Sequence, residues 1–162
     1  MLQVGDKVVY PMHGAGEITG TEECEIMDQV KQYYVLQLPV GNIKIMIPTD
    51  NADNIGLRQI STPEVIEQVK VTLLDPPDKP VGSWNKRFHM NLDRLKTGDI
   101  LEVASVIRNL LLQDRQRKIS SGERRLLDLA KQIFISELSY ALDTTTDGAE
   151  SWVKTQLEAN SF

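Results

Sequence analysis

The stretch Gln59-Ile60-Ser61-Thr62-Pro63-Glu64 marks a change of pattern along the chain. Thr62 suits the cap of a helix, and Pro63 suits the first helical turn, where its missing N–H removes no bond. Before this stretch, short apolar runs alternate with turn residues; after it, capping signals open a series of helices. The sequence therefore predicts an α+β protein with a β-rich domain over residues 1–60 and an all-helical domain over residues 61–162.

Turn residues divide the first domain into short strands. Pro11–Gly16 and Pro39–Asn42 are typical of turns, and Pro48 ends an apolar run because it has no N–H for a ladder bond. The predicted strands cover Lys7–Tyr10, Glu17–Met27, Gln32–Leu38 and Ile43–Ile47. Strands this short, joined by short turns, indicate a small antiparallel barrel or a strongly bent sheet.

The last of these strands alternates between apolar and outward-facing positions. A period of two places Ile43, Ile45 and Ile47 on one face, which we expect in the core, and Lys44 and Met46 on the other. If the strand lies at an edge, its free backbone groups can accept a strand from a partner. The alternative is that Met46 covers a second small core.

Five helices are predicted in the second domain. Ser120 and Glu123 match a capping box, and the Pro-rich residues Asp75–Gly82 predict a stiff extended connector after the first helix. The predicted helices start at Thr62, Ser83, Asp99, Ser120 and Asp147, and the first four end near Leu74, Lys96, Lys118 and Leu142. Trp152, in the last helix, is expected to pack inside the bundle.

Residues for catalysis and metal binding are sparse. The chain has one cysteine and two histidines, which excludes an internal disulfide and argues against a zinc site. Gly14-Ala15-Gly16 lacks the Gly-Lys-Ser/Thr ending of a phosphate loop, and no G-x-S-x-G elbow occurs. We expect no enzyme activity, no metal and no cofactor.

Charge is distributed unevenly along an acidic chain. The net charge is −5, but residues 84–131 carry 11 Lys and Arg against 6 Asp and Glu, which leaves −10 for the rest. Such a division favours contact between one segment and a polyanion, although long helices also carry many solvated charges. The N-terminal residues do not resemble a signal peptide and no apolar run is long enough to span a membrane, so we expect a cytoplasmic protein. We also expect it to be a monomer.

Trp84 admits two interpretations. It begins a helical stripe that continues through Phe88, Leu92 and Leu95, which favours a buried anchor. It also lies at the end of that stripe, beside the Pro-rich connector, where burial is hardest to complete.

Polar and cationic residues around Trp84 favour the second interpretation, in which the indole is exposed and contacts a partner. Asn85, Lys86 and Arg87 follow it directly and are residue types that contact phosphates and minor-groove edges. Further cations flank a predicted turn over residues 119–122, where we expect them to come close together: Arg115, Arg117 and Lys118 before it, and Arg124 and Arg125 after it. These cations also suit helix ends.

Three segments resemble the CarD family of bacterial transcription regulators. Val4–Gly16 is similar to the opening of that family, Trp84-Asn85-Lys86-Arg87-Phe88 to its tryptophan segment, and Ser120–Leu138 to its long C-terminal helix and approach. The opening motif is shared with the polymerase-interaction module of transcription-repair coupling factors. Together the segments extend the resemblance over nearly the whole chain.

The resemblance implies a Tudor-like barrel that binds the β subunit of RNA polymerase by strand addition, here along Ile43–Ile47. It also implies a helical domain that contacts promoter DNA and stabilises the open complex. By this resemblance Trp84 is the wedge at the upstream edge of the bubble, Lys86 and Arg87 are backbone clamps, and no base sequence is read. The expected DNA-contacting residues are Trp84, Asn85, Lys86, Arg87, His89, Lys118, Arg124 and Arg125.

Some positions depart from the family pattern. Some relatives have arginines at the polymerase contact where this chain has Cys24 and Met46, and His89 replaces a further lysine. An alternative function is a protein interaction module that bridges two partners without DNA, in which Trp84 belongs to the core. A third is an RNA-associated barrel protein.

Overall fold

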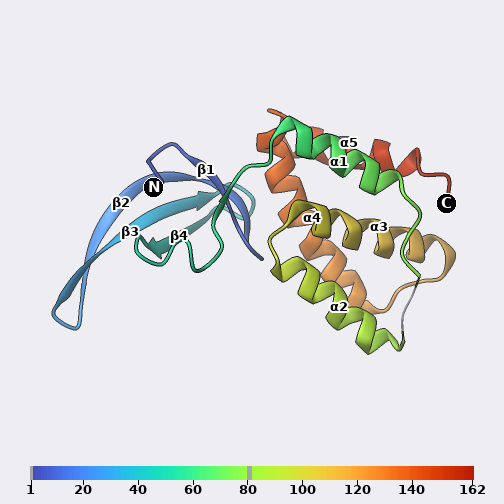
Figure 1. The fold of residues 1–162 in the computed structure, drawn as a ribbon, viewed down its shortest axis with the longest axis horizontal. Coiled ribbons are helices and arrows are strands. Elements are labelled where there is room, and N and C mark those ends of the chain that lie inside the picture. Colours follow the sequence, from blue (N-terminus) through green and yellow to red (C-terminus); the bar gives the residue numbers. More distant parts are fainter. Residues whose placement is uncertain (1, 80–81) are drawn as a thin grey trace.

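The computed structural model describes residues 2–79 and 82–162, in which a five-stranded antiparallel sheet precedes five helices (Figure 1). The predicted α+β class is therefore confirmed. The strands are β1 (Lys7–Tyr10), β2 (Gly14–Ile26), β3 (Gln29–Leu38), β4 (Ile43–Pro48) and β5 (Arg58–Gln59). Their order in the sheet is β4-β3-β2-β1-β5, which makes β4 an edge strand.

Strand β5 was not predicted, because two residues are too few for an alternating pattern. It pairs with β1 through Val8 opposite Gln59 and Val9 opposite Arg58. The predicted strands β1 and β4 lie where the turn residues placed them, whereas β2 and β3 each begin three residues earlier than expected. The extension makes a long β2–β3 hairpin that reaches away from the helices (Figure 1).

The turn of this hairpin contains two residues with left-handed backbone. Met27 and Asp28 have φ values of 52° and 62°, as a two-residue type I′ turn requires at both central positions. Neither residue is glycine, so the sequence carried no strong signal for a tight turn here.

Glycines in the Gly14-Ala15-Gly16 segment permit close packing. A Cβ on Gly16 would lie 2.3 Å from the carbonyl oxygen of Gln37 on β3, and a Cβ on Gly14 would lie 2.6 Å from Ser136 Oγ. Gly14 also has a φ of 106°, which side chains rarely permit. Gly14 and Gly16 therefore allow β2 to pack closely against β3 and α4.

The helices begin at the predicted caps, with one exception. They are α1 (Pro63–Leu74), α2 (Trp84–Lys96), α3 (Ile100–Gln116), α4 (Ser121–Ala141) and α5 (Thr146–Glu158). Thr62, Ser83, Asp99 and Ser120 all accept a hydrogen bond from their own helix, and the capping box of α4 is complete. The last helix is capped by Thr145 instead of starting at Asp147.

The sheet and the helices each have a hydrophobic cluster of their own. The sheet cluster includes Val8, Ile18, Leu36, Leu38 and Ile47, and the helical cluster includes Leu73, Leu95, Ile107, Leu110, Phe134 and Leu138, with Trp152 packed against it. The prediction that all three β4 isoleucines are core is wrong for Ile43, which is 49% exposed. Alternation selects the face of a strand, but Ile43 lies at the margin of the sheet, beyond the cluster that covers Ile47.

Polar contacts join the sheet to α4. Ala15 N–H donates to Ser136 Oγ at 2.9 Å, and Arg58 of β5 pairs with the buried carboxylate of Glu137 at 2.7 Å. These contacts connect the sheet directly to the middle of the longest helix. Of the predicted connector, Pro80 and Val81 lie outside the described residues. Within the described part of the chain, no helix has the length and apolarity needed to cross a bilayer.

Candidate functional site

Trp84 is the first residue of α2 and is 55% exposed. Ser83 caps the helix by accepting a hydrogen bond from Lys86 N–H at 3.3 Å, which places the indole on the first turn. Burial increases along the predicted stripe: Phe88 and Leu92 are partly buried, and Leu95 is 1% exposed. The stripe therefore enters the core at its far end, and the interpretation of Trp84 as a core anchor is wrong.

A hollow of about 510 Å³ lies beside Trp84, between α2 and the α3–α4 turn. Its lining residues are Trp84, Arg87, Gln113, Gln116, Arg117, Lys118, Ile119, Ser120 and Glu123. The predicted residues Arg87 and Lys118 thus come together with Trp84, although 31 positions separate Arg87 from Lys118. Asn85 and Lys86 are exposed on the same helical turn as Trp84.

Arg87 has a structural role that its sequence position did not reveal. Its Nε lies 3.9 Å from Oε2 of Glu123, which is only 2% exposed, and its Nη1 donates to the carbonyl of Gly82 at 3.3 Å. Among the described residues, neither Arg87 Nε nor Glu123 Oε2 has a hydrogen-bond partner. Arg87 therefore joins the start of α2 to the start of α4 while it lines the hollow.

Asp114 relieves the charge crowding that was expected at the α3–α4 turn. It accepts a hydrogen bond from Arg124 Nη2 at 2.9 Å and another from Ile119 N–H at 3.1 Å. The bond from Arg124, followed by that from Ile119, holds the pKa of Asp114 below its ordinary value. Arg115 is directed away from the turn, because its Nη2 donates to the Leu157 carbonyl of α5 at 3.3 Å.

Five of the predicted DNA-contacting residues do not line the hollow: Asn85, Lys86, His89, Arg124 and Arg125. Arg124 forms an ion pair with Asp114, and Arg125 is exposed near the start of α4. His89 is also exposed, and its ring lies edge-on to that of Phe88, with 5.6 Å between the centroids. All of these residues are exposed, and their assignment to DNA stays a prediction.

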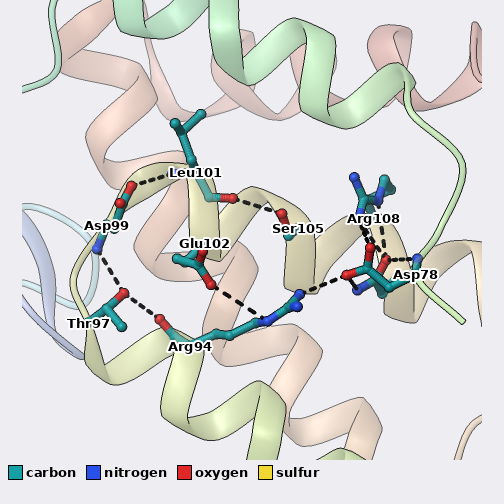
Figure 2. A network of polar contacts seen from close by, with 9 residues as sticks. Asp78, Arg94, Thr97, Asp99, Leu101, Glu102, Ser105 and Arg108 are labelled. Atoms are coloured by element: carbon teal, nitrogen blue, oxygen red, sulfur yellow. Dashed lines mark hydrogen bonds and ion pairs between the residues drawn. The ribbon is translucent and has the colours of Figure 1, made fainter. Parts of the chain in front are cut away.

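A polar cluster around Asp78 holds the connector against α2 and α3 (Figure 2). Oδ2 of Asp78 accepts hydrogen bonds from Arg94 Nη1 and Asn109 Nδ2, each at 3.0 Å, and Oδ1 lies 3.3 Å from Arg108 Nη2. Burial alone would raise the pKa of Asp78, but the bonds from Asn109 and Arg94 and the charge of Arg108 outweigh it and lower the pKa.

This cluster was missed at the level of sequence. The only signal was a carboxylate within a Pro-rich stretch, which equally suits an ordinary turn. Arg94 also approaches Glu102 of α3, with Nε and Oε2 3.6 Å apart, so one guanidinium connects three segments (Figure 2). The cluster fixes the chain shortly before Trp84.

The outer edge of β4 presents free backbone groups at defined positions. Thr49 N–H donates to the Gln32 carbonyl at 3.0 Å, next to the pair in which Tyr33 lies opposite Pro48. The N–H group of Thr49 therefore points toward β3. Since hydrogen-bonded and non-bonded pairs alternate in an antiparallel ladder, the N–H groups of Lys44 and Met46 point away from β3. Met46 is 41% exposed, so it does not cover a second core.

Apolar residues at the tip of the β2–β3 hairpin were also missed. Ile26, Met27 and Val30 are 53%, 92% and 66% exposed. They adjoin the part of β3 that extends past β4, because β4 pairs only with Tyr33–Leu38. Cys24 lies on the same hairpin, half-buried and opposite Lys31. Exposed apolar side chains of this size are typical of surfaces that partners cover.

Models of known protein families match both halves of the chain. Residues 2–61 match a family model described as "CarD-like/TRCF RID domain", and residues 68–154 match one described as "CarD, C-terminal domain". The chain is 34% identical over 138 residues to "Putative transcription factor YdeB" of Bacillus subtilis (strain 168), covering 85% of this chain and 90% of that protein.

A solved structure also matches the first half. The solution structure of the 72-residue N-terminal domain of Myxococcus xanthus CarD is 27% identical and covers 36% of this chain and 79% of that chain, with a TM-score of 0.32. The two family models and the Bacillus relative together extend over most of the sequence, sheet and helices alike. The chain therefore belongs to the CarD-like family of transcription factors.

Proposed function

We propose that this protein binds the β subunit of RNA polymerase through the outer edge of β4 and stabilises the promoter open complex, with Trp84 inserted at the upstream edge of the melted DNA. The observation that carries the proposal is the exposure of Trp84, which is 55% uncovered beside a hollow lined by Arg87, Arg117 and Lys118. A large apolar ring flanked by cations suits an unstacked base step next to phosphates.

Docking on polymerase is supported by the sheet edge. Lys44 and Met46 are exposed, and their backbone N–H groups face outward from β4, as strand addition requires. The match of residues 2–61 to the "CarD-like/TRCF RID domain" model supports an interaction of this half of the chain with RNA polymerase. The apolar tip at Ile26, Met27 and Val30 continues this side of the sheet.

Tethering reconciles DNA contact with an acidic chain. A protein with a net charge of −5 should bind free DNA poorly, but attachment to polymerase raises the effective concentration of the helical domain at the promoter. Stacking of one aromatic ring on a base contributes roughly 1–3 kcal/mol. That energy corresponds to a change of about 5- to 150-fold in the ratio of open to closed complexes.

The decisive experiment measures the lifetime of polymerase–promoter open complexes after addition of a competitor. Wild-type protein should lengthen this lifetime, Trp84→Ala should bind polymerase but lose the effect, and Lys44→Ala/Met46→Ala should weaken polymerase binding. Val71→Ala is the matched control, because Val71 is a 61% exposed apolar residue on α1 that does not line the hollow. Full activity of Trp84→Ala would refute the wedge.

A second candidate function is a protein bridge that does not contact DNA. It is favoured by the exposed hairpin tip, which offers a surface for another protein at the far end of the sheet. Photocrosslinking from position 84 in the polymerase–promoter complex distinguishes the two. Crosslinks to DNA support the wedge, and crosslinks only to protein support the bridge.

A further inference from the structure

A second hollow adjoins the one beside Trp84. It has a volume of about 430 Å³ and lies between the connector, α2 and α3. The two hollows share the lining residues Arg87, Gln113 and Gln116, so they adjoin, and together they are here named the α2–α3 groove. The second hollow is also lined by Pro76, Pro77, Asp78, Lys79, Met90, Asn91, Arg94, Asn109 and Phe162.

The groove is basic in an acidic protein. Five cations line it, against the two carboxylates of Asp78 and Glu123: Lys79, Arg87, Arg94, Arg117 and Lys118. Both carboxylates are already engaged, Asp78 by Arg94 and Arg108 and Glu123 by the cap residue Ser120. The surplus of positive charge therefore lacks a matching anion among the described residues of the groove, and a polyanion would complement it.

Each hollow of the groove has one exposed aromatic side chain. Trp84 is 55% exposed in the first hollow, and Phe162 is 52% exposed in the second. Phe162 is held in place by Asn160, whose Oδ1 accepts from Phe162 N–H at 2.9 Å. Asn160 is itself 7% exposed and donates from Nδ2 to the carbonyls of Leu73 and Asp75 at 2.9 and 2.8 Å.

Amide side chains also line the groove. Gln113 and Gln116 lie one turn apart on α3, and Asn91 lines the second hollow from α2. Amide groups can donate to and accept from base edges, while aromatic rings stack on bases regardless of their identity. Cations, an aromatic surface in each hollow and amide side chains are the elements of a single-strand binding site.

We propose that the α2–α3 groove holds a short single-stranded DNA segment that leaves the upstream edge of the bubble at Trp84 and continues toward Phe162. This inference rests on the proposed function and extends it from one wedged base step to a path for the strand beyond. Cavities of roughly 300–1,000 Å³ enclose a ligand the size of a few rings. Each hollow therefore suits one or two nucleotides.

The test uses the polymerase-bound protein and two promoter DNAs, one a blunt upstream duplex and one a fork with a short single-stranded extension. Wild-type protein should hold the fork more tightly than the blunt duplex, by about 5-fold or more if one base stacks. Gln113→Glu/Gln116→Glu places two negative charges in the groove and should weaken binding of the fork more than binding of the blunt duplex, so that the preference is lost.

A matched control separates the groove from general charge effects. Gln68→Glu/Gln132→Glu makes the same charge change at two exposed positions, on α1 and α4, that line neither hollow. It should keep the fork preference. Phe162→Ala, at the last residue of the chain, should reduce the preference without affecting folding, because the ring is half exposed.

Several outcomes overturn the inference. If the groove variant and its control bind the fork equally, or if a glutamate-rich peptide displaces the extension as well as oligodeoxythymidine does, the groove is not a path for DNA. These failures differ from failure of the proposed function. Trp84→Ala would still shorten the open-complex lifetime in the first case, whereas an inactive wedge would leave that lifetime unchanged.

Discussion

Arg58 and Glu137 form a two-pronged ion pair that joins the sheet to the middle of α4. Arg58 Nη1 donates to Glu137 Oε2 and Nη2 donates to Oε1, both at 2.7 Å. Ser61 donates to Oε2 from its N–H at 2.9 Å and from its hydroxyl at 2.6 Å. Arg58 Nε also donates to the Gly98 carbonyl at 2.7 Å, so one side chain fixes β5, α4 and the α2–α3 turn relative to one another.

Removing Arg58 should destabilise the protein strongly. The Glu137 carboxylate is 3% exposed, and Arg58→Ala would leave it buried without its countercharge. Loss of one partner of a buried pair costs roughly 3–5 kcal/mol. Urea unfolding at neutral pH measures the change in the free energy of unfolding.

The control for this prediction is the exposed pair of Arg124 and Asp114. Its side chains are 47% and 25% exposed, so Arg124→Ala should reduce the free energy of unfolding by at most about 1 kcal/mol. Equal losses for the two variants would contradict the assigned role of Arg58.

Trp84→Ala should leave the fold almost unchanged. More than half of the Trp84 side chain is in solvent, and surface substitutions typically change stability by less than about 1 kcal/mol. Phe134→Ala, at a ring that is 1% exposed, should instead cost about 3–5 kcal/mol. Thermal unfolding of both variants tests this contrast, and a large loss at Trp84 would show that its ring is buried in solution.

Proline substitutions in β4 should separate partner binding from stability. Lys44 N–H points away from β3, so Lys44→Pro removes an outward donor and keeps the ladder, whereas Ile45→Pro removes a ladder bond and leaves the Leu36 carbonyl unpaired. We expect normal unfolding but weakened polymerase binding for Lys44→Pro. For Ile45→Pro we expect a loss of about 1–3 kcal/mol or more in the free energy of unfolding.

Lys44→Ala controls for the side chain in that comparison. It keeps the backbone donor, so polymerase binding in a pull-down or fluorescence titration should exceed that of Lys44→Pro. Equal binding by the two variants would show that strand addition does not use this N–H group.

The stabilising contribution of Asp78 should depend on pH with a defined sign. Its pKa in the folded protein lies below the ordinary value of 3.8, so folding favours the ionised form. The contribution is then fully present above the pKa of the unfolded chain and disappears as the pH falls through the folded pKa. Asp78→Asn should therefore be less stable than wild type at neutral pH, and the difference should shrink in acid.

Urea unfolding of both proteins across the acid range measures this difference. A gap between the two free energies that stays constant through the titration of the carboxyl group would contradict the role of Asp78 as an ionised partner of Arg94 and Arg108.

Local sequence signals determined most of the element boundaries. Thr62, Ser83, Asp99 and Ser120 cap helices because a cap bond joins residues only two or three positions apart. The alternation in β4 likewise determined that Lys44 and Met46 face outward. Such interactions are completed within a few residues, so the sequence alone was sufficient to predict them.

Tertiary structure decided what surrounds those elements. The periodicity of α2 left the burial of Trp84 open, and the position of the α3–α4 turn settled it by leaving one side of the ring in solvent. Arg58 and Glu137 are 79 positions apart, and Arg94 and Asp78 are 16 apart. Contacts between residues so distant in the chain depend on how whole elements pack, because packing brings together groups that no local pattern relates.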